Sequence, residues 1–274
     1  MIGKTNSVIV SGGENTLKKL IDARQSADSL FISYGGSTVD GLIQPSDTEN
    51  ATSTQNMFGL CKNLNSAPTL NTSKVTNMKN MFNQCTSLIN VPLYDTSNVT
   101  NMSRMFYGSG VITIPLLDTS NVTDMSEMFS LCPSLTSVPT LNISKVINMG
   151  YMFGSCTSLT SAPLLDTSNV TRMQATFDHC SSLTTVPQWN VNKVTNLNYI
   201  FNGCTKLKSI LMTNIGANLD ISASTQFERS DLLVILNNLK TVTSSKKLTM
   251  GATNLAKLTD EDKAIATNKG WTLA

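Results

Sequence analysis

The chain has 274 residues, of which 40% are hydrophobic and 14% are charged, and its formal net charge is +2. So small a charge gives no strong field that would attract nucleic acid or an anionic membrane surface. No apolar run approaches the roughly 20 residues that cross a bilayer. We therefore expect a folded protein without a nucleic-acid partner and without membrane insertion.

The N-terminal segment, residues 1–46, differs in composition from the rest of the chain. Met1–Gly13 contains one short apolar run, Val8–Val10, which is far shorter than the core of a signal peptide, so no export signal is expected. We predict that the part before Ser29 attaches the protein to its assembly. Asn15–Phe31 has apolar residues at helix-compatible spacing and is predicted to form a capping helix.

A repeat of 24 residues, with one step of 23, dominates residues 47–211. Its most regular member is a phenylalanine, found at Phe58, Phe82, Phe106, Phe129, Phe153, Phe177 and Phe201. Pro115 follows Phe106 by nine residues where the other prolines follow by ten, which places the deletion between them. The consensus is M-F-x-x-C-x-S-L-T-S-V-P-x-L-D-T-S-N-V-T-N-M-S-x. Its fixed apolar positions indicate that every turn buries the same side.

Each repeat is predicted to contain a short strand and a short helix. Val99, Met102 and Phe106 have the spacing of one helix face. Leu135–Pro139 is β-compatible and ends at a proline, which cannot continue a ladder of hydrogen bonds. A unit this small cannot bury its apolar side alone, so its neighbours must stack on it. The predicted fold is an α/β solenoid of parallel turns.

Both ends are predicted to be caps. Leu30-Phe31 matches the Met-Phe of the consensus and Asp47–Phe58 matches its second half, so the first turn is degenerate, as terminal repeats usually are. Residues 212–274 form the predicted C-terminal cap. We expect two helices and two strands in this region, in the order Asp231–Lys240, Lys247–Met250, Asp260–Thr267 and Trp271–Leu273.

The motifs M-F-x-x-C-x-S-L-T-S-V-P and D-T-S-N-V-T-N-M-S, over residues 47–211, resemble the BspA-like leucine-rich repeat family of bacterial surface proteins. The resemblance implies a right-handed, leucine-rich-repeat-like solenoid, found on bacterial surfaces and among phage or prophage structural proteins. The ending Asn254–Ala274 is similar to terminal caps of that family. Secreted members carry a leader, a lipobox cysteine and a wall-sorting tail. This sequence shows none of these, which favours a phage-type member assembled in the host cytoplasm.

Six cysteines stand three residues after a repeat phenylalanine, at Cys61, Cys85, Cys132, Cys156, Cys180 and Cys204. None belongs to a C-x-x-C pair of the kind that binds zinc. In-register stacking would bring them about 5 Å apart, a separation that does not by itself exclude disulfides. We expect a buried column of free thiols, which forms the structural core ladder together with the phenylalanines.

Histidine and methionine give no sign of chemistry. His179 is the only histidine and stands at a variable repeat position, so no repeated catalytic set can include it. The thirteen methionines recur mainly on the predicted helix face and are expected to fill the core. The sequence thus predicts no catalytic residue, no cofactor and no metal site.

One repeat position alternates between Asp and Asn, and the position three residues later varies with it. Where the first residue is Asp the second is Asn, and where the first is Asn the second is Lys. An Asx turn or a helix cap explains the first position. A calcium ladder is the alternative, because Asp95, Asp118 and Asn98 offer oxygen ligands, but lysine in the other turns argues against it.

The outward strand positions form the candidate binding surface, namely Ser66, Asn90, Thr113, Ser137, Ser161 and Thr185. These side chains are small and uncharged, so a flat surface is expected. It could hydrogen-bond a glycan or a protein, or be plain solvated surface.

The function predicted from the sequence is that of a non-enzymatic phage virion protein of the tail, fibre, baseplate or capsid exterior. Its repeat surface would bind a host-surface glycan or protein or another virion protein, and a homo-oligomer is compatible with it. The first alternative is a bacterial cell-surface adhesin. The second is a glycan-active solenoid enzyme, which would need paired acids that the repeat instead disperses.

Overall fold

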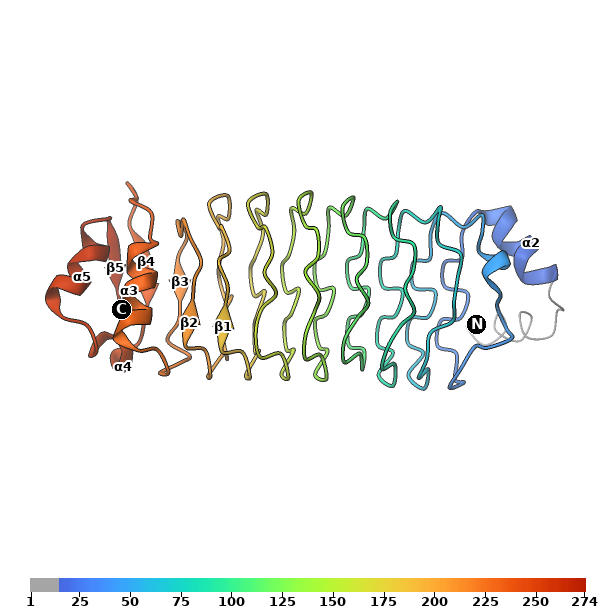
Figure 1. Ribbon diagram of the computed structural model, residues 1–274, viewed down its shortest axis with the longest axis horizontal. Coiled ribbons are helices and arrows are strands. Elements are labelled where there is room, and N and C mark those ends of the chain that lie inside the picture. The colour runs from blue at the N-terminus through green and yellow to red at the C-terminus, as the bar shows by residue number, and fades with distance from the viewer. Residues whose placement is uncertain (1–14) are drawn as a thin grey trace.

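The computed structural model describes residues 15–274, so residues 1–14 of the predicted attachment segment before Ser29 lie outside the described residues. The chain forms an elongated stack of turns with helices at both ends (Figure 1). At the N-terminal end are α2 (Asn15–Arg24) and the short 3-10 helix η1 (Pro45–Asp47). No helix within residues 15–274 has the length and apolar character needed to cross a membrane.

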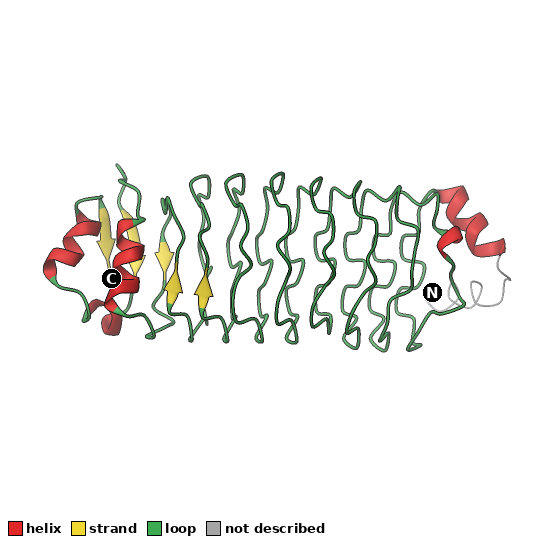
Figure 2. Cartoon of the chain, in the orientation of Figure 1, coloured by secondary structure: helices red, strands yellow, loops and turns green. Residues whose placement is uncertain are grey.

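The short helix predicted in each repeat is wrong. Within residues 48–228, all of which are described, there is no α-helix, and Figure 2 shows this part of the chain mainly as loops and turns. The N–H of Met105 donates to the carbonyl of Met102, three residues back, whereas the N–H of Phe106 donates to Met128 of the next turn, 2.9 Å away. Consecutive tight turns therefore bury every third residue and imitate the periodicity of a helix.

Parallel pairing between equivalent residues of successive turns holds the stack in register. One ladder of isolated bridges joins Ser53, Asn77, Asn101, Asp124, Asn148 and Arg172. A second lies where strands were predicted and includes Ser66 paired with Asn90, and β1 (Thr185–Val186) paired with β2 (Ser209–Ile210). Strands in this region are at most two residues long, and in the described chain Leu135–Pro139 forms neither strand nor bridge.

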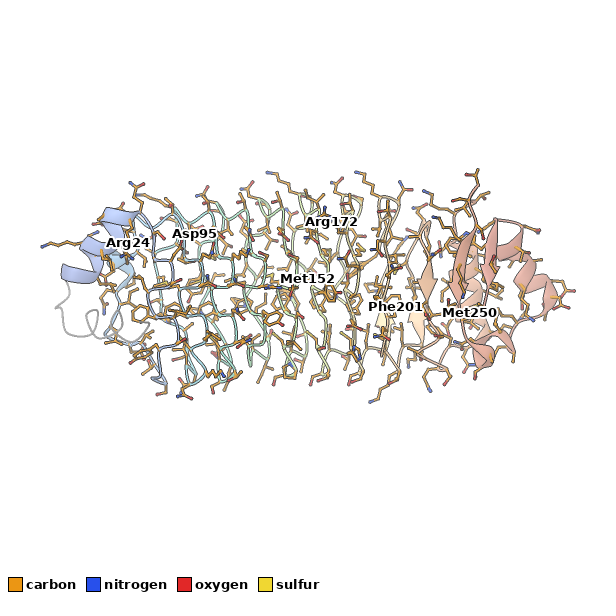
Figure 3. The ribbon with its side chains drawn as sticks, turned by 180° about the vertical axis from the view of Figure 1, so that it is seen from behind. Arg24, Asp95, Met152, Arg172, Phe201 and Met250 are labelled. Carbon is orange, nitrogen blue, oxygen red and sulfur yellow. The ribbon has the colours of Figure 1, made fainter. Side chains whose placement is uncertain are left out.

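A single column of phenylalanine rings runs through the core. Phe31, Phe58, Phe82, Phe106, Phe129, Phe153, Phe177 and Phe201 stack in sequence with centroids 5.4–6.1 Å apart and ring planes within 13° of parallel. These separations exceed the ~3.5–4.0 Å of direct carbon contact, so the rings are laterally offset, the arrangement that their quadrupoles favour. Phe31 extends the column into the degenerate first turn. Figure 3 shows the side chains of the described residues along the whole length of the stack.

The shortened repeat is accommodated by glycines. Gly108 adopts a left-handed φ of 64°, at a repeat position where other turns place residues such as Leu131 at φ 60°. A Cβ on Gly110 would collide with the backbone carbonyl of Thr86 in the preceding turn. Loss of one residue between Phe106 and Pro115 therefore brings the two backbones together, and only glycine fits there.

The C-terminal cap contains the predicted elements in the predicted order. The observed elements are β3 (Leu219–Asp220), α3 (Arg229–Asn237), β4 (Lys246–Thr249), α4 (Ala252–Leu255), α5 (Asp260–Thr267) and β5 (Trp271–Leu273). The three strands form one parallel sheet in the order β3-β4-β5. The side chain of Thr259 accepts a hydrogen bond from the N–H of Asp262 at the start of α5, while both carboxylate oxygens of Asp262 accept from Arg229 at 2.7 Å. These contacts fix α5 against α3.

Truncation of one ring should test the column. We expect Phe129→Ala to lower the free energy of unfolding by about 3–5 kcal/mol, because it removes a fully buried ring that two neighbours contact. The matched control is Tyr151→Ala, whose side chain is 41% exposed and should cost far less. Guanidinium unfolding followed by circular dichroism measures both variants. Equal losses would contradict a stabilising role for the stacked rings.

Candidate functional site

The candidate surface follows the second ladder along the stack. Ser66, Asn90, Thr113, Ser137 and Ser161 are exposed, and Thr185 is half-buried. Backbone hydrogen bonds between neighbouring turns hold adjacent residues in register, as from the N–H of Ile112 to the carbonyl of Ile89 (3.1 Å) and from Thr184 to Thr160 (2.9 Å). The stack therefore presents these six side chains as one regular row.

The surface beside this row is more apolar than the sequence predicted. Exposed aliphatic side chains occur at two repeat positions near the row, at Ile89 (49% exposed), Leu93 (69%), Ile112 (43%), Leu116 (63%) and Leu164 (59%). Three of them follow the repeat proline directly, a pattern readable in the sequence. The predicted row of small, uncharged side chains is thus bordered by exposed aliphatics on neighbouring turns, and apolar patches of this kind are typical of protein-binding surfaces.

The cysteine column lies inside the stack, and all six cysteines are free and buried. Each thiol donates to the carbonyl oxygen of the phenylalanine one turn earlier, as from Cys132 Sγ to Phe106 (2.9 Å) and from Cys156 Sγ to Phe129 (3.0 Å). Burial raises the pKa of Cys61 and of Cys132 to about 11 and that of Cys204 to about 12. The cysteines are thus protonated structural groups and are not poised as nucleophiles.

The alternating Asp and Asn position forms Asx turns. Asp95, Asp118 and Asp166 each accept the backbone N–H of the serine two residues later, at 2.9–3.1 Å. Hydrogen bonds from Ser120, chiefly from its backbone N–H, lower the pKa of Asp118. The carboxylates therefore have a local structural role, as the Asx-turn interpretation holds.

The lysines three residues after the asparagines of this repeat position form hydrogen bonds between successive turns. Lys74, Lys145 and Lys193 each donate to the side-chain oxygen of an asparagine one turn earlier, at 2.6 Å. Across residues 15–274 there is no cluster of three His, Cys, Asp or Glu side chains arranged to hold a metal ion. Of the residues named for a calcium ladder, Asp95 and Asp118 accept hydrogen bonds within their own turns, and Asn98 donates its Nδ2–H to the carbonyl of Ser73 one turn earlier.

His179 lies on the surface, with its side chain 62% exposed and Nδ1 2.8 Å from Asp178 Oδ1. It occupies the left-handed repeat position, with φ 57°. Asp178 in turn accepts a hydrogen bond from Asn202 of the next turn, 2.7 Å away. The pair therefore links two turns at the surface.

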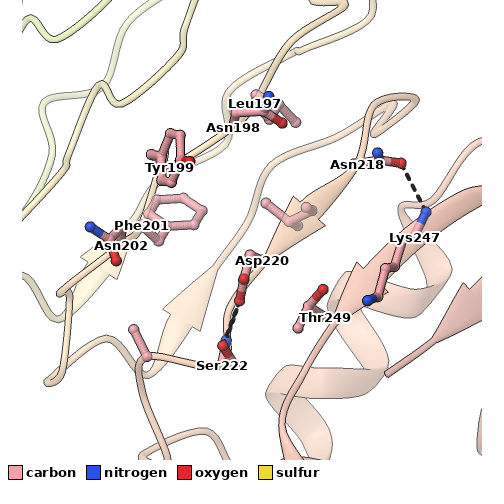
Figure 4. Close-up of a pocket in the computed structure, with 12 residues that line it drawn as sticks. Leu197, Asn198, Tyr199, Phe201, Asn202, Asn218, Asp220, Ser222, Lys247 and Thr249 are labelled. Carbon is pink, nitrogen blue, oxygen red and sulfur yellow. Dashed lines mark hydrogen bonds between the residues drawn. The ribbon is translucent and has the colours of Figure 1, made fainter.

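A pocket of about 500 Å³ lies between the last phenylalanine turn and the C-terminal cap, and sequence analysis missed it. One wall comprises residues from Leu197 to Asn202, and the other comprises residues 218–223 with Lys247 and Thr249. Figure 4 shows Tyr199 and Phe201 on one side and Asp220, Lys247 and Thr249 on the other. The side chain of Tyr199 is 65% exposed. Its exposure at a variable repeat position gave no signal in the sequence.

The repeats match a known family model, described as "Mycoplasma protein of unknown function, DUF285". The model matches four overlapping stretches, residues 27–117, 86–164, 110–215 and 159–230. Together these stretches cover residues 27–230, well over half of the chain. No curated protein matches the sequence.

The buried thiols predict a loss of stability in alkali. Because the pKa of Cys132 rises from its ordinary 9.0 to about 11 on folding, the folded chain binds this proton more tightly. The protonated thiol of Cys132 makes its full contribution to the free energy of unfolding below pH 9. Between pH 9 and 11 this contribution should fall by about 1.4 kcal/mol per pH unit. We expect the free energy of unfolding of Cys132→Ala to fall less steeply over that range. Identical slopes for the two proteins, measured by guanidinium unfolding, would refute the linkage.

The Asx-turn interpretation predicts that substitution of Asp118 changes the stability of the protein and that calcium does not. Asp118→Ala should lower the free energy of unfolding by about 0.5–1.5 kcal/mol because it removes the acceptor for the Ser120 N–H, whereas Asp118→Asn keeps an acceptor and should be nearly neutral. Adding calcium chloride should leave the thermal midpoint unchanged. A calcium-dependent rise in the midpoint that Asp118→Asn abolishes would support the calcium ladder instead.

Proposed function

We propose that this chain, which belongs to the family described as Mycoplasma protein of unknown function, DUF285, is a non-enzymatic protein that displays a repeat surface to a binding partner. The proposal is drawn from its architecture. The observation that carries the proposal is the row from Ser66 to Thr185, held in register beside exposed aliphatics. A rigid stack fixes the backbone that carries such a row before binding, which lowers the entropic cost of association.

The finer identity is also a proposal. The repeat motifs support a BspA-like leucine-rich repeat protein with a right-handed, leucine-rich-repeat-like solenoid. Within that family the phage-type setting is our first choice, as part of a tail, fibre, baseplate or capsid exterior, with localisation in the virion. The partner is then a host-surface glycan or protein, or another virion protein. The exposed aliphatics Leu93, Leu116 and Leu164 favour a protein over a glycan.

A bacterial cell-surface adhesin is the second candidate, since the same row would serve a partner at the cell surface. A glycan-active enzyme is less well supported, because hydrolysis needs a pair of carboxyl groups across one substrate. The repeat acids Asp95, Asp118 and Asp166 instead bind the backbone of their own turns.

Two measurements test the proposal. We expect mass spectrometry of purified particles to detect the chain in stoichiometric amount, and an adhesin would instead be found on intact bacteria. In particle or cell binding, Ser137→Arg should weaken attachment at least about tenfold, since it places a long cation in the row. Ser144→Arg, an exposed serine seven residues further along the same turn, is the matched control. Equal binding by both variants would overturn the assignment of the row.

A further inference from the structure

The stack opens at one place, after the turn that carries Phe201. The chain begins its next turn in register, because Asp220 stands 24 residues after Asn196 and makes the same local contact. Asn196 Oδ1 accepts the N–H of Asn198 and Asp220 Oδ1 accepts the N–H of Ser222, both at 2.9 Å. The repeat thus continues as far as Ser222.

Beyond Ser222 the chain leaves the stack and enters the cap. Ser224 Oγ donates to the carbonyl of Leu207 at 2.6 Å, and Lys257 Nζ donates to the carbonyls of Thr225 (2.9 Å) and Phe227. The first contact ties Ser224 to the last repeat, and the contacts of Lys257 direct residues 225–227 toward the cap. Residues 224–227 therefore do not supply the carbonyl row that a regular turn would offer.

In the preceding turns, the carbonyl row of one turn accepts hydrogen bonds from three backbone N–H groups, on alternate residues, of the turn before it. The N–H groups of Ala175, Phe177 and His179 donate to the carbonyls of Asn198 (2.9 Å), Ile200 (3.1 Å) and Asn202 (2.7 Å). The same three bonds join each pair of successive turns from the turn of Phe31 to the turn of Phe201.

The equivalent donors of the last turn belong to Tyr199, Phe201 and Gly203. Among the hydrogen bonds of the described chain, none uses these three N–H groups. Unpaired backbone donors beside a pocket are costly unless water or a ligand satisfies them.

Tyr199 and Phe201 line the 500 Å³ pocket between the stack and the cap, and Gly203 follows Phe201 by two residues. The donor segment consists of tight turns, since the N–H of Ile200 donates to the carbonyl of Leu197 and that of Asn202 to the carbonyl of Tyr199. Inside the stack, the carbonyls that accept such donors belong to a segment with the same tight turns, so a matching acceptor has the backbone of a repeat turn. Beside the donors, the open ring of Tyr199 offers an apolar surface, while the edge strand β3 and Thr249 line the opposite side (Figure 4).

We propose that this pocket binds a peptide segment that adopts the tight-turn backbone of a repeat, whose alternate carbonyl oxygens accept hydrogen bonds from the N–H groups of Tyr199, Phe201 and Gly203. An apolar side chain of the peptide packs against the ring of Tyr199. Recognition runs mainly through the backbone and continues the hydrogen bonding that joins successive turns of the stack. The proposal rests on the unpaired donors and does not depend on the virion role.

The probe for the test is a capped synthetic peptide with the sequence of residues 148–155, NMGYMFGS. Inside the stack, the carbonyls of Gly150, Met152 and Gly154 in this sequence accept the same three bonds from the turn before it. Amide NMR and hydrogen exchange of the full chain report binding at single residues. We expect saturating peptide to shift the amides of Tyr199 and Gly203 and to slow exchange at both at least about tenfold. The amides of Ala175 and His179, already paired, are the internal control.

Two variants, each with a matched control, test whether the peptide binds in this pocket. Ala223→Trp fills the pocket and should abolish the shifts, whereas Ala256→Trp, at an exposed residue outside the pocket lining, should leave them intact. Tyr199→Ala should weaken peptide binding at least about threefold through loss of the ring contact, and Tyr151→Ala, at the same repeat position of an inner turn, should not.

Three results would overturn the proposal. The first is no change at the amides of Tyr199, Phe201 and Gly203 with saturating peptide. The second is unaltered peptide binding by a folded Ala223→Trp variant. The third is a response of these amides to a neutral oligosaccharide such as cellohexaose but not to the peptide, which would identify a glycan site instead.

Discussion

The structure depends on one constraint, which is that every turn must repeat the previous one in register. A turn places its phenylalanine on the ring before it and directs the N–H groups of alternate residues to the carbonyls of the turn after it, as Phe106 does with Phe82 and with Met128. Burial of the ring and pairing of the backbone thus need the same 23- or 24-residue length. The thiol of each cysteine adds a third tie, to a phenylalanine carbonyl one turn back, as from Cys132 to Phe106.

This constraint also explains the surface. Side chains outside the core and the Asx turns are free to vary, and they recur at fixed heights along the stack because the backbone does. The row from Ser66 to Thr185 is regular for that reason, and so are the exposed leucines after the prolines. Where the register ends, at Ser222, the donors of Tyr199, Phe201 and Gly203 lose their partners, and a pocket opens beside them.

Much of the arrangement could be predicted from residue types, and the failures have physical causes. The phenylalanine period indicated one buried side per turn, and the helix predicted over Asp260–Thr267 is present as α5. The helix predicted over Val99–Phe106 was wrong, because consecutive tight turns bury residues with the same spacing and the sequence does not show that the N–H of Phe106 bonds outside its own turn. The pocket could not be predicted, since Asp220 still fits the repeat and the departure at Ser222 depends on distant contacts of Ser224 and Lys257.

Deletion of one complete repeat tests the constraint most directly. Removal of residues 130–153 joins Phe129 to Gly154 and restores the consensus, whereas removal of residues 130–141 leaves half a turn. We predict that the 24-residue deletion folds cooperatively and that solution scattering shows a rod shorter by about 5 Å, one strand spacing, while the 12-residue deletion fails to fold. Similar unfolding curves for the two deletions would contradict the account, because turn register would then not be what holds the chain together.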